Sequence, residues 1–403
     1  MPAGFFSSET VRREPSLDVS RYPACGKCGL YKNCNSPRMQ VTGESKRKVL
    51  IVAEAPGKTE DDEGVQLVGD AGQRLRQHLK KLGWDLDRDC WKTNSIICRP
   101  QGNVIADKYI EACRPNLTRT MRELEPRVVI LLGLSSVKSL IGMDWRTGID
   151  QLTRWVGWRI PSQTWNAWVC PTYHPSYLLR REQPVLDLWF RRHLKDALSL
   201  ADAELTRPWR EVPHWDDDVQ IIEDPGDASY AIRSFIGDAP VAFDYESNTL
   251  KPDAKHSRIV CCSLSDGERT ITYPWTTSTA AATREFLVSP TPKWGWNCKH
   301  EQRWTMAKLG TRVRNWQADG MLLAHVLDNR SGITSAKFQA YVQLGQPSYN
   351  DYIGPFLKAK SSNDRNRIRE VEKRSLLLYC GMDSLVEHKV IRRQLRELEG
   401  RSG

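Results

Sequence analysis

The first half of the chain alternates short apolar runs with amphipathic stretches. Apolar runs of strand length lie within residues 48–57, 90–98, 127–133 and 167–176. Between them, apolar residues recur at helical spacing within residues 71–84, 107–124, 135–142 and 185–205. Strands that alternate with helices predict a parallel, mostly buried sheet.

Polar side chains stand at the ends of three of these apolar runs. Glu54 follows the first run, Asn94 lies on the second and His174 follows the last. In parallel sheets, functional groups gather beyond the carboxyl ends of the strands. We therefore expect these three side chains at one edge of the sheet.

The second half of the chain has a different pattern. A short helix is expected within residues 229–237, and strands of a meander are expected within residues 239–250 and 257–275. Helical segments are expected from Lys299 onward, with an interruption near residues 345–355. This order is typical of an α+β or mixed α/β unit.

Length and composition set the number of domains and exclude some classes of protein. A chain of 403 residues predicts two or three domains. We place a loose tail at residues 1–20, an α/β domain at 21–205, a linker at 206–218 and a second domain at 219–403. The apolar runs are shorter than the about 20 residues that a membrane span needs. The start of the chain lacks an apolar signal-peptide core, so we expect a cytoplasmic protein whose 11 cysteines are metal ligands or buried thiols.

The positive charge of the protein lies in its first half. Residues 1–200 carry 31 Lys and Arg against 22 Asp and Glu, whereas the later residues carry 28 against 27. A basic first half suits a polyanionic partner, most simply nucleic acid. The charge alone is explained equally well by a soluble protein that has a high isoelectric point and no polyanionic partner.

Four cysteines of the first half have the character of metal ligands. Cys25 and Cys28 form a C-x2-C pair, Cys98 follows a strand, and Cys113 lies within an expected helix. Four thiolates brought together can hold zinc or an iron–sulfur cluster, and this asymmetric spacing fits a zinc ribbon poorly. Cys34 is a fifth candidate.

A family resemblance covers residues 25–200. The segments that carry it are, in order, CGKCGLYKNC, VLIVAEAPGKTEDDEGVQLVGDAGQRL, TNSIICRP, the later Cys113 and TYHPSYLLR. They resemble the motifs of the iron–sulfur uracil-DNA glycosylases, family 4 and its relatives. The resemblance implies a three-layer α/β fold with a parallel sheet and a pocket for an extruded uracil. It also implies a [4Fe–4S] cluster on Cys25, Cys28, Cys98 and Cys113.

The same resemblance implies roles for residues around the uracil pocket. Glu54 matches the acidic residue before the Pro-Gly turn, and Glu60 and Asp61 match the acidic pair that follows. Asn94 matches the amide that reads the uracil edge, and His174 matches the histidine near the glycosidic bond. Such groups suit excision of a flipped base: an amide satisfies both a donor and an acceptor, a carboxylate positions water, and a histidine stabilises the leaving base.

The sequence departs from the family where a phenylalanine usually stacks on the uracil. The family carries Pro-Phe where this chain carries Gln66 and Leu67, so Leu67 offers the base contact area without an aromatic face. Two interpretations therefore stay open. Either the N-terminal domain excises uracil, or it is a non-catalytic module that binds DNA or a polymerase.

Acidic side chains recur at three places in the second half. Asp244 and Glu246 lie two residues apart at the end of an apolar strand, so both face the same side. Glu301 lies at the start of an expected helix. Tyr379 and Asp383 lie four residues apart on another helix and share one of its faces.

These segments resemble the three exonuclease motifs of the DnaQ-like 3′–5′ exonucleases, in particular the tyrosine-bearing proofreading domains of family-A DNA polymerases. The resemblance covers residues 220–398 and implies a ribonuclease-H-like fold with two Mg²⁺ or Mn²⁺ ions. Asp319 matches an acidic position of this fold that is usually structural and does not bind the metal ions. The resemblance further implies that Asp244, Glu246 and Asp383 bind the metal ions and that Tyr379 orients the attacking water. Glu301 matches a catalytic carboxylate that is usually an aspartate, and Asn297 matches the amide that positions the substrate.

Together the two resemblances predict a DNA-processing protein with a uracil-DNA glycosylase-like domain and a 3′–5′ exonuclease that acts on single strands or 3′ ends. No polymerase half follows Asp383 in this sequence, which favours proofreading or repair in trans to a separate polymerase. A phage origin would suit that arrangement. RNA is the alternative substrate, since enzymes of the RNase D kind share the exonuclease pattern, but the neighbouring domain favours DNA.

Overall fold

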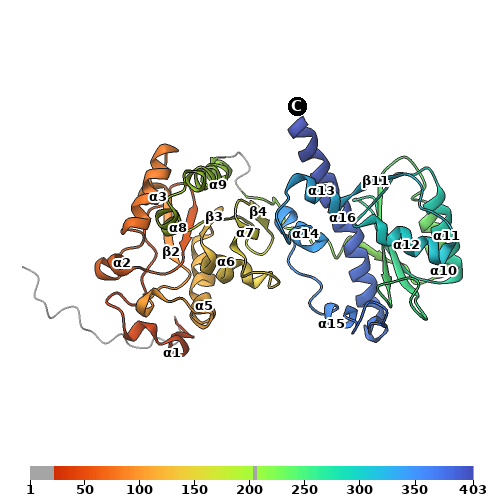
Figure 1. Ribbon diagram of the computed structural model, residues 1–403, viewed down its shortest axis with the longest axis horizontal. Helices are drawn as coiled ribbons and strands as arrows, with labels where there is room; N and C mark the ends of the chain where they lie inside the picture. The colour runs from red at the N-terminus through yellow and green to blue at the C-terminus, as the bar shows by residue number, and fades with distance from the viewer. Residues whose placement is uncertain (1–21, 203–206, 403) are drawn as a thin grey trace, which may run out of the picture. The chain divides into compact units, whose positions relative to one another are not determined.

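The computed structural model describes residues 22–202 and 207–402, and the chain divides into two compact units, residues 1–210 and 211–403 (Figure 1). The tail expected at residues 1–20 lies outside the described residues. Each unit is built on one sheet with helices packed against it, so the expected fold class, α/β in two units, is confirmed. Within the described ranges, no helix is both long and apolar enough to span a membrane.

The N-terminal unit holds a five-stranded sheet with the strand order β2-β1-β3-β5-β4. Its strands are β1 (Val49–Ala53), β2 (Cys90–Asn94), β3 (Val128–Leu132), β4 (Ile160–Ser162) and β5 (Ala167–Thr172). Strands β1, β2, β3 and β5 are parallel, as predicted, and the short antiparallel edge strand β4 was not predicted. Every residue of β1 and β3 is buried, because helices cover both faces of the sheet.

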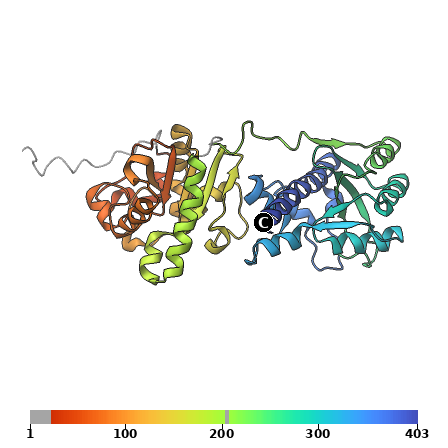
Figure 2. The ribbon, with the colours of Figure 1, turned by 90° about the horizontal axis from the view of Figure 1, so that it is seen from above.

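Helices form the outer two of the three layers in this unit (Figures 1 and 2). On one face, Leu75, Leu79, Phe190 and Leu194 pack against Ile51 and its neighbours in the core. On the other face, α6 contacts β1 and β3 and is backed by α5. The helices are α1 (Cys25–Cys28), α2 (Lys58–Glu63), α3 (Asp70–Lys81), α4 (Leu86–Asp89), α5 (Asp107–Leu124), α6 (Leu134–Leu140), α7 (Leu152–Trp155), α8 (Pro175–Arg181) and α9 (Pro184–Asp202). The helices α2, α4, α7 and α8, of four to seven residues, were not predicted.

The C-terminal unit holds a six-stranded mixed sheet with the order β11-β10-β7-β8-β9-β6. Its strands are β6 (Val219–Ile221), β7 (Val241–Ser247), β8 (Ile259–Ser265), β9 (Thr270–Pro274), β10 (Lys293–Gly295) and β11 (Trp316–Asp319). The predicted meander is confirmed, because β7, β8 and β9 pair antiparallel in chain order. Strands β10 and β11 run parallel to β7, and β6 runs parallel to β9; these three short strands were not predicted.

Helices cover both faces of this sheet as well. Ile232, Phe286 and Trp304, from α10, α11 and α12, pack against Phe243 of β7. The long α16 lies along the opposite face and contacts β6 to β10, with α13 and α14 packed on it (Figure 1). The bounds are α10 (Pro225–Arg233), α11 (Thr277–Val288), α12 (Cys298–Leu309), α13 (Gly320–Leu327), α14 (Ala336–Leu344), α15 (Gly354–Leu357) and α16 (Lys373–Ser402). This packing brings the first half of α16 over β7, where Cys380 Sγ lies 3.9 Å from Asp244 O.

Candidate active sites and cysteine cluster

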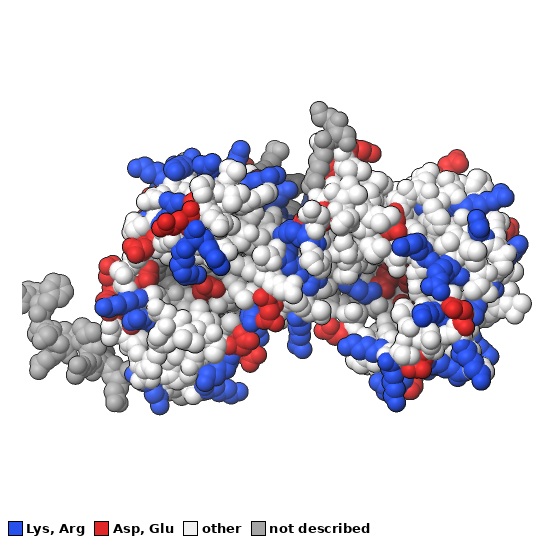
Figure 3. All heavy atoms as spheres, in the orientation of Figure 1, with Lys and Arg blue, Asp and Glu red and all other residues white. Residues whose placement is uncertain are grey.

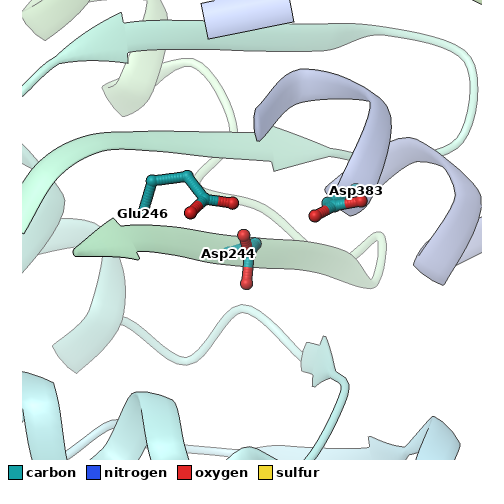
Figure 4. Close-up of side chains that lie close together, drawn as sticks. All are labelled: Asp244, Glu246 and Asp383. Atoms are coloured by element: carbon teal, nitrogen blue, oxygen red, sulfur yellow. The ribbon is translucent and has the colours of Figure 1, made fainter. Parts of the chain in front are cut away.

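Three carboxylates converge in the C-terminal unit. Asp244 and Glu246 project from the same side of β7, and Asp383 projects from α16, which crosses that strand. Oxygen atoms of the three side chains lie within 4.8 Å of one another. Figure 4 shows the three carboxyl groups turned toward a common space. Carboxylate oxygens are the ligands that Mg²⁺ and Mn²⁺ prefer, so the donor set fits the expected divalent ions.

The buried carboxylates repel one another. Burial, together with the nearby Asp383 carboxylate, raises the pKa of Asp244 to about 8. Burial also raises the pKa of Glu246 well above its ordinary range, and the charges of Asp244 and Asp383 raise it further. A cation between them would remove this repulsion, which is a second reason that the site fits a metal ion.

A lysine and a tyrosine hold Asp383 in this arrangement. Lys337 Nζ, from α14, lies 2.8 and 2.7 Å from the two oxygens of Asp383, and the Tyr349 hydroxyl donates to Oδ1 at 2.5 Å. Burial alone would lower the pKa of Lys337, but the Asp383 carboxylate raises it overall, so the lysine is charged. The sequence analysis missed both residues, because neither lies in a recognisable motif.

Tyr379 and two further carboxylates surround the triad. Tyr379 lies one turn before Asp383 and is buried, with its ring centroid 5.9 Å from that of Tyr349. Glu301 and Glu387 are 3% and 5% exposed, and Oε2 of each has no hydrogen-bond partner. Burial raises the pKa of both carboxyls well above the ordinary range, and the Asp244 charge raises each further. The sequence analysis missed Glu387, although one more turn along the face of Tyr379 and Asp383 leads to it.

The start of α12 is fixed by Asp319. Its carboxylate accepts from the main-chain N–H groups of Asn297 at 3.0 Å and Cys298 at 2.9 Å. Asn297 caps the helix with a left-handed backbone, φ 56°, which asparagine tolerates better than most residues. Asp319 thereby positions the helix turn that carries Glu301, and the substrate-positioning role of Asn297 stays a prediction.

In the N-terminal unit, Glu54, Asn94 and His174 lie at the carboxyl ends of β1, β2 and β5. Oε1 of Glu54 accepts from Ser135 N at 3.1 Å and from Ser135 Oγ at 3.2 Å, at the start of α6. Gly133 makes this approach feasible, since its φ is 86° and a Cβ there would collide with the Glu54 carboxyl group. The carboxylate is therefore anchored before any substrate binds.

The protonation of His174 follows from its contacts. His174 caps the start of α8, because its Nδ1 accepts from Ser176 N at 3.2 Å; Nδ1 also lies 2.8 Å from Ser176 Oγ. Burial lowers the pKa of His174, while the Glu54 charge opposes this in part. The ring is therefore neutral at neutral pH, with its proton on Nε2, where it can act as a hydrogen-bond donor.

Glu60 holds the loop that separates α2 from α3. Its Oε2 accepts from Gly57 N at 3.1 Å, and its Oε1 accepts from Val68 N at 3.1 Å and Gly69 N at 2.9 Å. The carboxylate of the neighbouring Asp61 likewise accepts from the main-chain N–H groups of residues 35 and 36. These contacts are structural, and a catalytic role for Glu60 stays a prediction.

Asn94 contacts Gln66, a residue for which no role was predicted. Asn94 is 3% exposed, and its Nδ2 donates to Oε1 of Gln66, which is fully buried. Gln66 Nε2 in turn donates to the main-chain oxygen of Gln40 at 3.2 Å. Leu67, expected beside the base, is 5% exposed and belongs to the hydrophobic core with Leu75.

The four predicted cluster ligands line one pocket, together with Tyr31, Asn116 and three other residues. The lining thiols are Cys25, Cys28, Cys98 and Cys113. All eleven cysteines lie within the described ranges and are free. Burial raises the pKa of Cys113 to about 11, which disfavours a bare thiolate there. Cys34 hydrogen-bonds with Cys98 and does not belong to this lining.

N–H groups point at two of these sulfur atoms. Arg38 N donates to Cys98 Sγ at 3.2 Å, and Ile97 N and Asn116 Nδ2 each donate to Cys113 Sγ at 3.4 Å. Hydrogen bonds of this kind surround Cys-ligated iron–sulfur clusters and tune their potentials. The donor set and its surroundings therefore fit a Cys₄ cluster.

Comparison with known proteins identifies the N-terminal unit. The family model described as the uracil DNA glycosylase superfamily matches residues 41–199. A type-4 uracil-DNA glycosylase of Pyrobaculum aerophilum is 37% identical over 173 residues, which are 42% of this chain and 86% of that protein. This chain belongs to the uracil DNA glycosylase superfamily. A type-4 enzyme of Saccharolobus solfataricus is 33% identical over 183 residues, which are 43% of this chain and 82% of that protein, so the glycosylase resemblance of residues 25–200 is confirmed.

Solved structures also resemble part of the chain. The catalytic core of RRP6 from Trypanosoma brucei has a TM-score of 0.37 at 11% identity, over 46% of this chain and 48% of that one. Escherichia coli RNase D, an exoribonuclease involved in structured RNA processing, has a TM-score of 0.32 at 14% identity, over 45% of each chain. The chain thus spans about half the length of either. TM-scores of this size carry no argument about activity, so the C-terminal unit is interpreted from its own residues.

On the face drawn in Figure 3, the Lys and Arg residues of the described part of the chain do not form one continuous patch that could bind DNA. Figure 3 shows Lys and Arg spread over that face of each unit, with Asp and Glu among them, for the described part of the chain. The net charge of +10 therefore supports a polyanionic partner only in general terms. The proposed functions therefore follow from the residues of the two sites and not from the distribution of charge.

Proposed function

We propose that this chain is a DNA-processing enzyme that joins a uracil-DNA glycosylase unit to a metal-dependent 3′–5′ exonuclease. The observation that carries the exonuclease part is the convergence of Asp244, Glu246 and Asp383 within 4.8 Å, one helical turn from Tyr379. Membership of the glycosylase superfamily supports DNA as the substrate. The two activities would serve proofreading or repair in trans to a separate polymerase.

In the exonuclease unit, Asp244, Glu246 and Asp383 hold two divalent ions, Mg²⁺ or Mn²⁺. When bound, such ions stabilise the charge on the attacking and leaving oxygens and lower the pKa of water. Tyr379 orients the attacking water with its hydroxyl. The water oxygen bonds to phosphorus, the bond to the 3′ oxygen of the preceding nucleotide breaks, and that oxygen takes up a proton. The product is a nucleoside 5′-monophosphate and a strand one nucleotide shorter.

In the glycosylase unit, Asn94 reads the edge of an extruded uracil and Glu54 positions a water near the sugar. The bond between C1′ and N1 breaks, its electron pair leaves with the base, and the water oxygen bonds to C1′. His174 donates Nε2–H to the leaving base and so stabilises its negative charge. Cys25, Cys28, Cys98 and Cys113 would hold a [4Fe–4S] cluster, which would tie α1 to the segment after β2 and to α5.

One pair of assays tests both activities. With 5′-labelled DNA that lacks uracil, Mg²⁺ should produce a ladder of fragments that shortens from the 3′ end, and EDTA should abolish it. With a uracil-containing strand in EDTA followed by alkali, cleavage should occur at the uracil alone, since a glycosylase needs no divalent ion. A strand that stays intact in Mg²⁺ would reject the exonuclease, and one that stays intact at uracil would reject excision.

Binding without excision is the second candidate for the N-terminal unit. It is favoured by Leu67, which lies in the core where the family carries a stacking phenylalanine. Under this alternative the uracil strand is retained by the protein in EDTA but alkali leaves it whole. For the exonuclease, an RNA strand of the same sequence gives the matching test, and trimming of RNA beside intact DNA would reverse the choice of substrate.

A further inference from the structure

The pairing of Gln66 with Asn94 fixes which way the Asn94 amide points. A carboxamide has two ends of similar shape, an oxygen that accepts and an NH2 that donates, and rotation by half a turn about its last torsion exchanges them. Nothing about an isolated asparagine decides between the two orientations. In this chain two successive hydrogen bonds, which start at a main-chain carbonyl, fix the orientation of the Asn94 amide.

The first of these two hydrogen bonds is accepted by Gln40. Its main-chain oxygen can only accept a hydrogen bond, so Gln66 must present Nε2 to it, at 3.2 Å. The Oε1 of Gln66 then faces Asn94, and Asn94 must present Nδ2 to that oxygen. Because Gln66 is fully buried and Asn94 is 3% exposed, water cannot substitute freely for either partner.

The loop that carries Gln66 is itself held in place. Glu60 accepts from the N–H groups of Val68 and Gly69, directly after Gln66. The Gln73 side chain donates to Val68 O at 2.9 Å. Gly72 lies so close to the main chain of Leu67 that a Cβ there would collide with it. The acceptor that Gln66 offers to Asn94 is therefore fixed by the scaffold.

The orientation of this amide distinguishes two bases. The uracil edge presents the O4 acceptor beside the N3–H donor, whereas the cytosine edge presents the amino donor beside the N3 acceptor. An amide held in one orientation is complementary to only one of these edges, and a buried mismatch leaves polar groups unpaired. We infer that Gln66 is a positioning residue that sets base specificity: it holds the Asn94 amide in the orientation that accepts uracil and rejects cytosine. This inference rests on the proposed uracil recognition by the N-terminal unit.

The test is a binding comparison that does not require excision. Labelled single strands carry one central 2′-fluoro-deoxyuridine or 2′-fluoro-deoxycytidine, whose glycosidic bonds resist cleavage, and affinity is measured by fluorescence anisotropy in EDTA. The wild type should prefer the uracil strand, and Gln66→Met should reduce that preference by about tenfold or more, since a misplaced buried polar group costs that much in discrimination. Gln66→Glu should retain the preference, because the buried carboxyl group, when protonated, can donate to Gln40 O and still accept from Asn94.

Gln183→Met, the same change at an exposed glutamine, is the matched control and should leave the preference unchanged. Iron content and thermal melting report folding; if Gln66→Met does not fold, Gln66→Ala removes the same acceptor and carries the test. A Gln66→Met protein that discriminates as the wild type does, or a wild type with no preference, overturns the inference. Loss of excision with an intact uracil preference would reject the proposed excision alone.

Discussion

The two units prepare their site residues in opposite ways. In the glycosylase unit each predicted polar side chain is already satisfied by the scaffold: Ser135 binds the Glu54 carboxylate, and Ser176 binds His174 Nδ1. In the C-terminal unit, Asp244 and its neighbouring carboxylates face one another in a buried space, with their pKa values raised by burial and mutual repulsion. The first site is organised without ions. The second sets one charged lysine, Lys337, against three carboxylates, and the remaining negative charge needs cations or protons to balance it.

This difference matches the separate requirements of the two proposed activities. Groups that must recognise a neutral base need fixed hydrogen-bond directions, which neighbouring N–H and hydroxyl groups supply. Groups that must bind cations need uncompensated negative charge, which costs stability until the ion arrives.

The largest effect is expected from Asp244→Asn. The change removes one negative charge from the centre of the triad, so the exonuclease rate should fall on the order of a thousandfold. Uracil-specific cleavage in EDTA should stay at the wild-type level, because the other unit does not use this residue. Rates on 5′-labelled DNA measure the effect, with Asp238→Asn, an exposed aspartate of the same unit, as control. A near-normal rate would remove Asp244 from the site.

Loss of one cluster ligand should give the second effect, now in the other unit. Cys98→Ser should abolish the brown colour and the bound iron and lower the unfolding temperature of the glycosylase unit, because ligand binding and folding are linked. Exonuclease activity should change by less than about twofold, because the exonuclease residues belong to the other unit, whereas the cluster ligands line a pocket of the N-terminal unit. Cys34→Ser, outside the pocket lining, should keep the iron. Bound zinc in the wild type, without iron, would contradict the cluster.

The comparison also shows what the sequence alone can and cannot predict. The buried strands of the first sheet and the face shared by Tyr379 and Asp383 follow from local periodicity, and both were predicted. Short elements such as β10 and α8 were not predicted; β10 has only three residues, too few to show an alternating pattern. The contacts of Lys337 with Asp383 and of Gln66 with Asn94 were not predicted for another reason. The paired residues lie 46 and 28 positions apart in the sequence, and only tertiary packing brings them together.

A smaller effect is expected from Glu387→Gln. The pKa of this buried carboxyl is raised by burial and by the charges of Asp244 and Asp383, so the folded state binds its proton more tightly than the unfolded state does. Wild-type stability in EDTA should therefore decline as the pH rises above the ordinary carboxyl pKa, and the variant should lose part of that decline. At pH 8 the variant should be more stable by roughly 1–3 kcal/mol. Urea unfolding measures this, with Glu285→Gln, an exposed glutamate of α11, as control. A variant less stable than the wild type at pH 8 would mean that Glu387 has a partner.

The smallest effect concerns His174 in the glycosylase unit. Because burial lowers its pKa, the neutral ring persists to a lower pH than the usual value of about 6.5. Uracil cleavage in EDTA should therefore change by less than about twofold between pH 8 and 6.5. Nitrogen NMR of histidine-labelled protein, assigned with His174→Gln, should show a neutral ring with its proton on Nε2 over this range. Protonation of the ring within it would mean that Ser176 does not hold Nδ1 as an acceptor, and the contrast between a site that is satisfied without ions and one that needs them would fail at its best-defined residue.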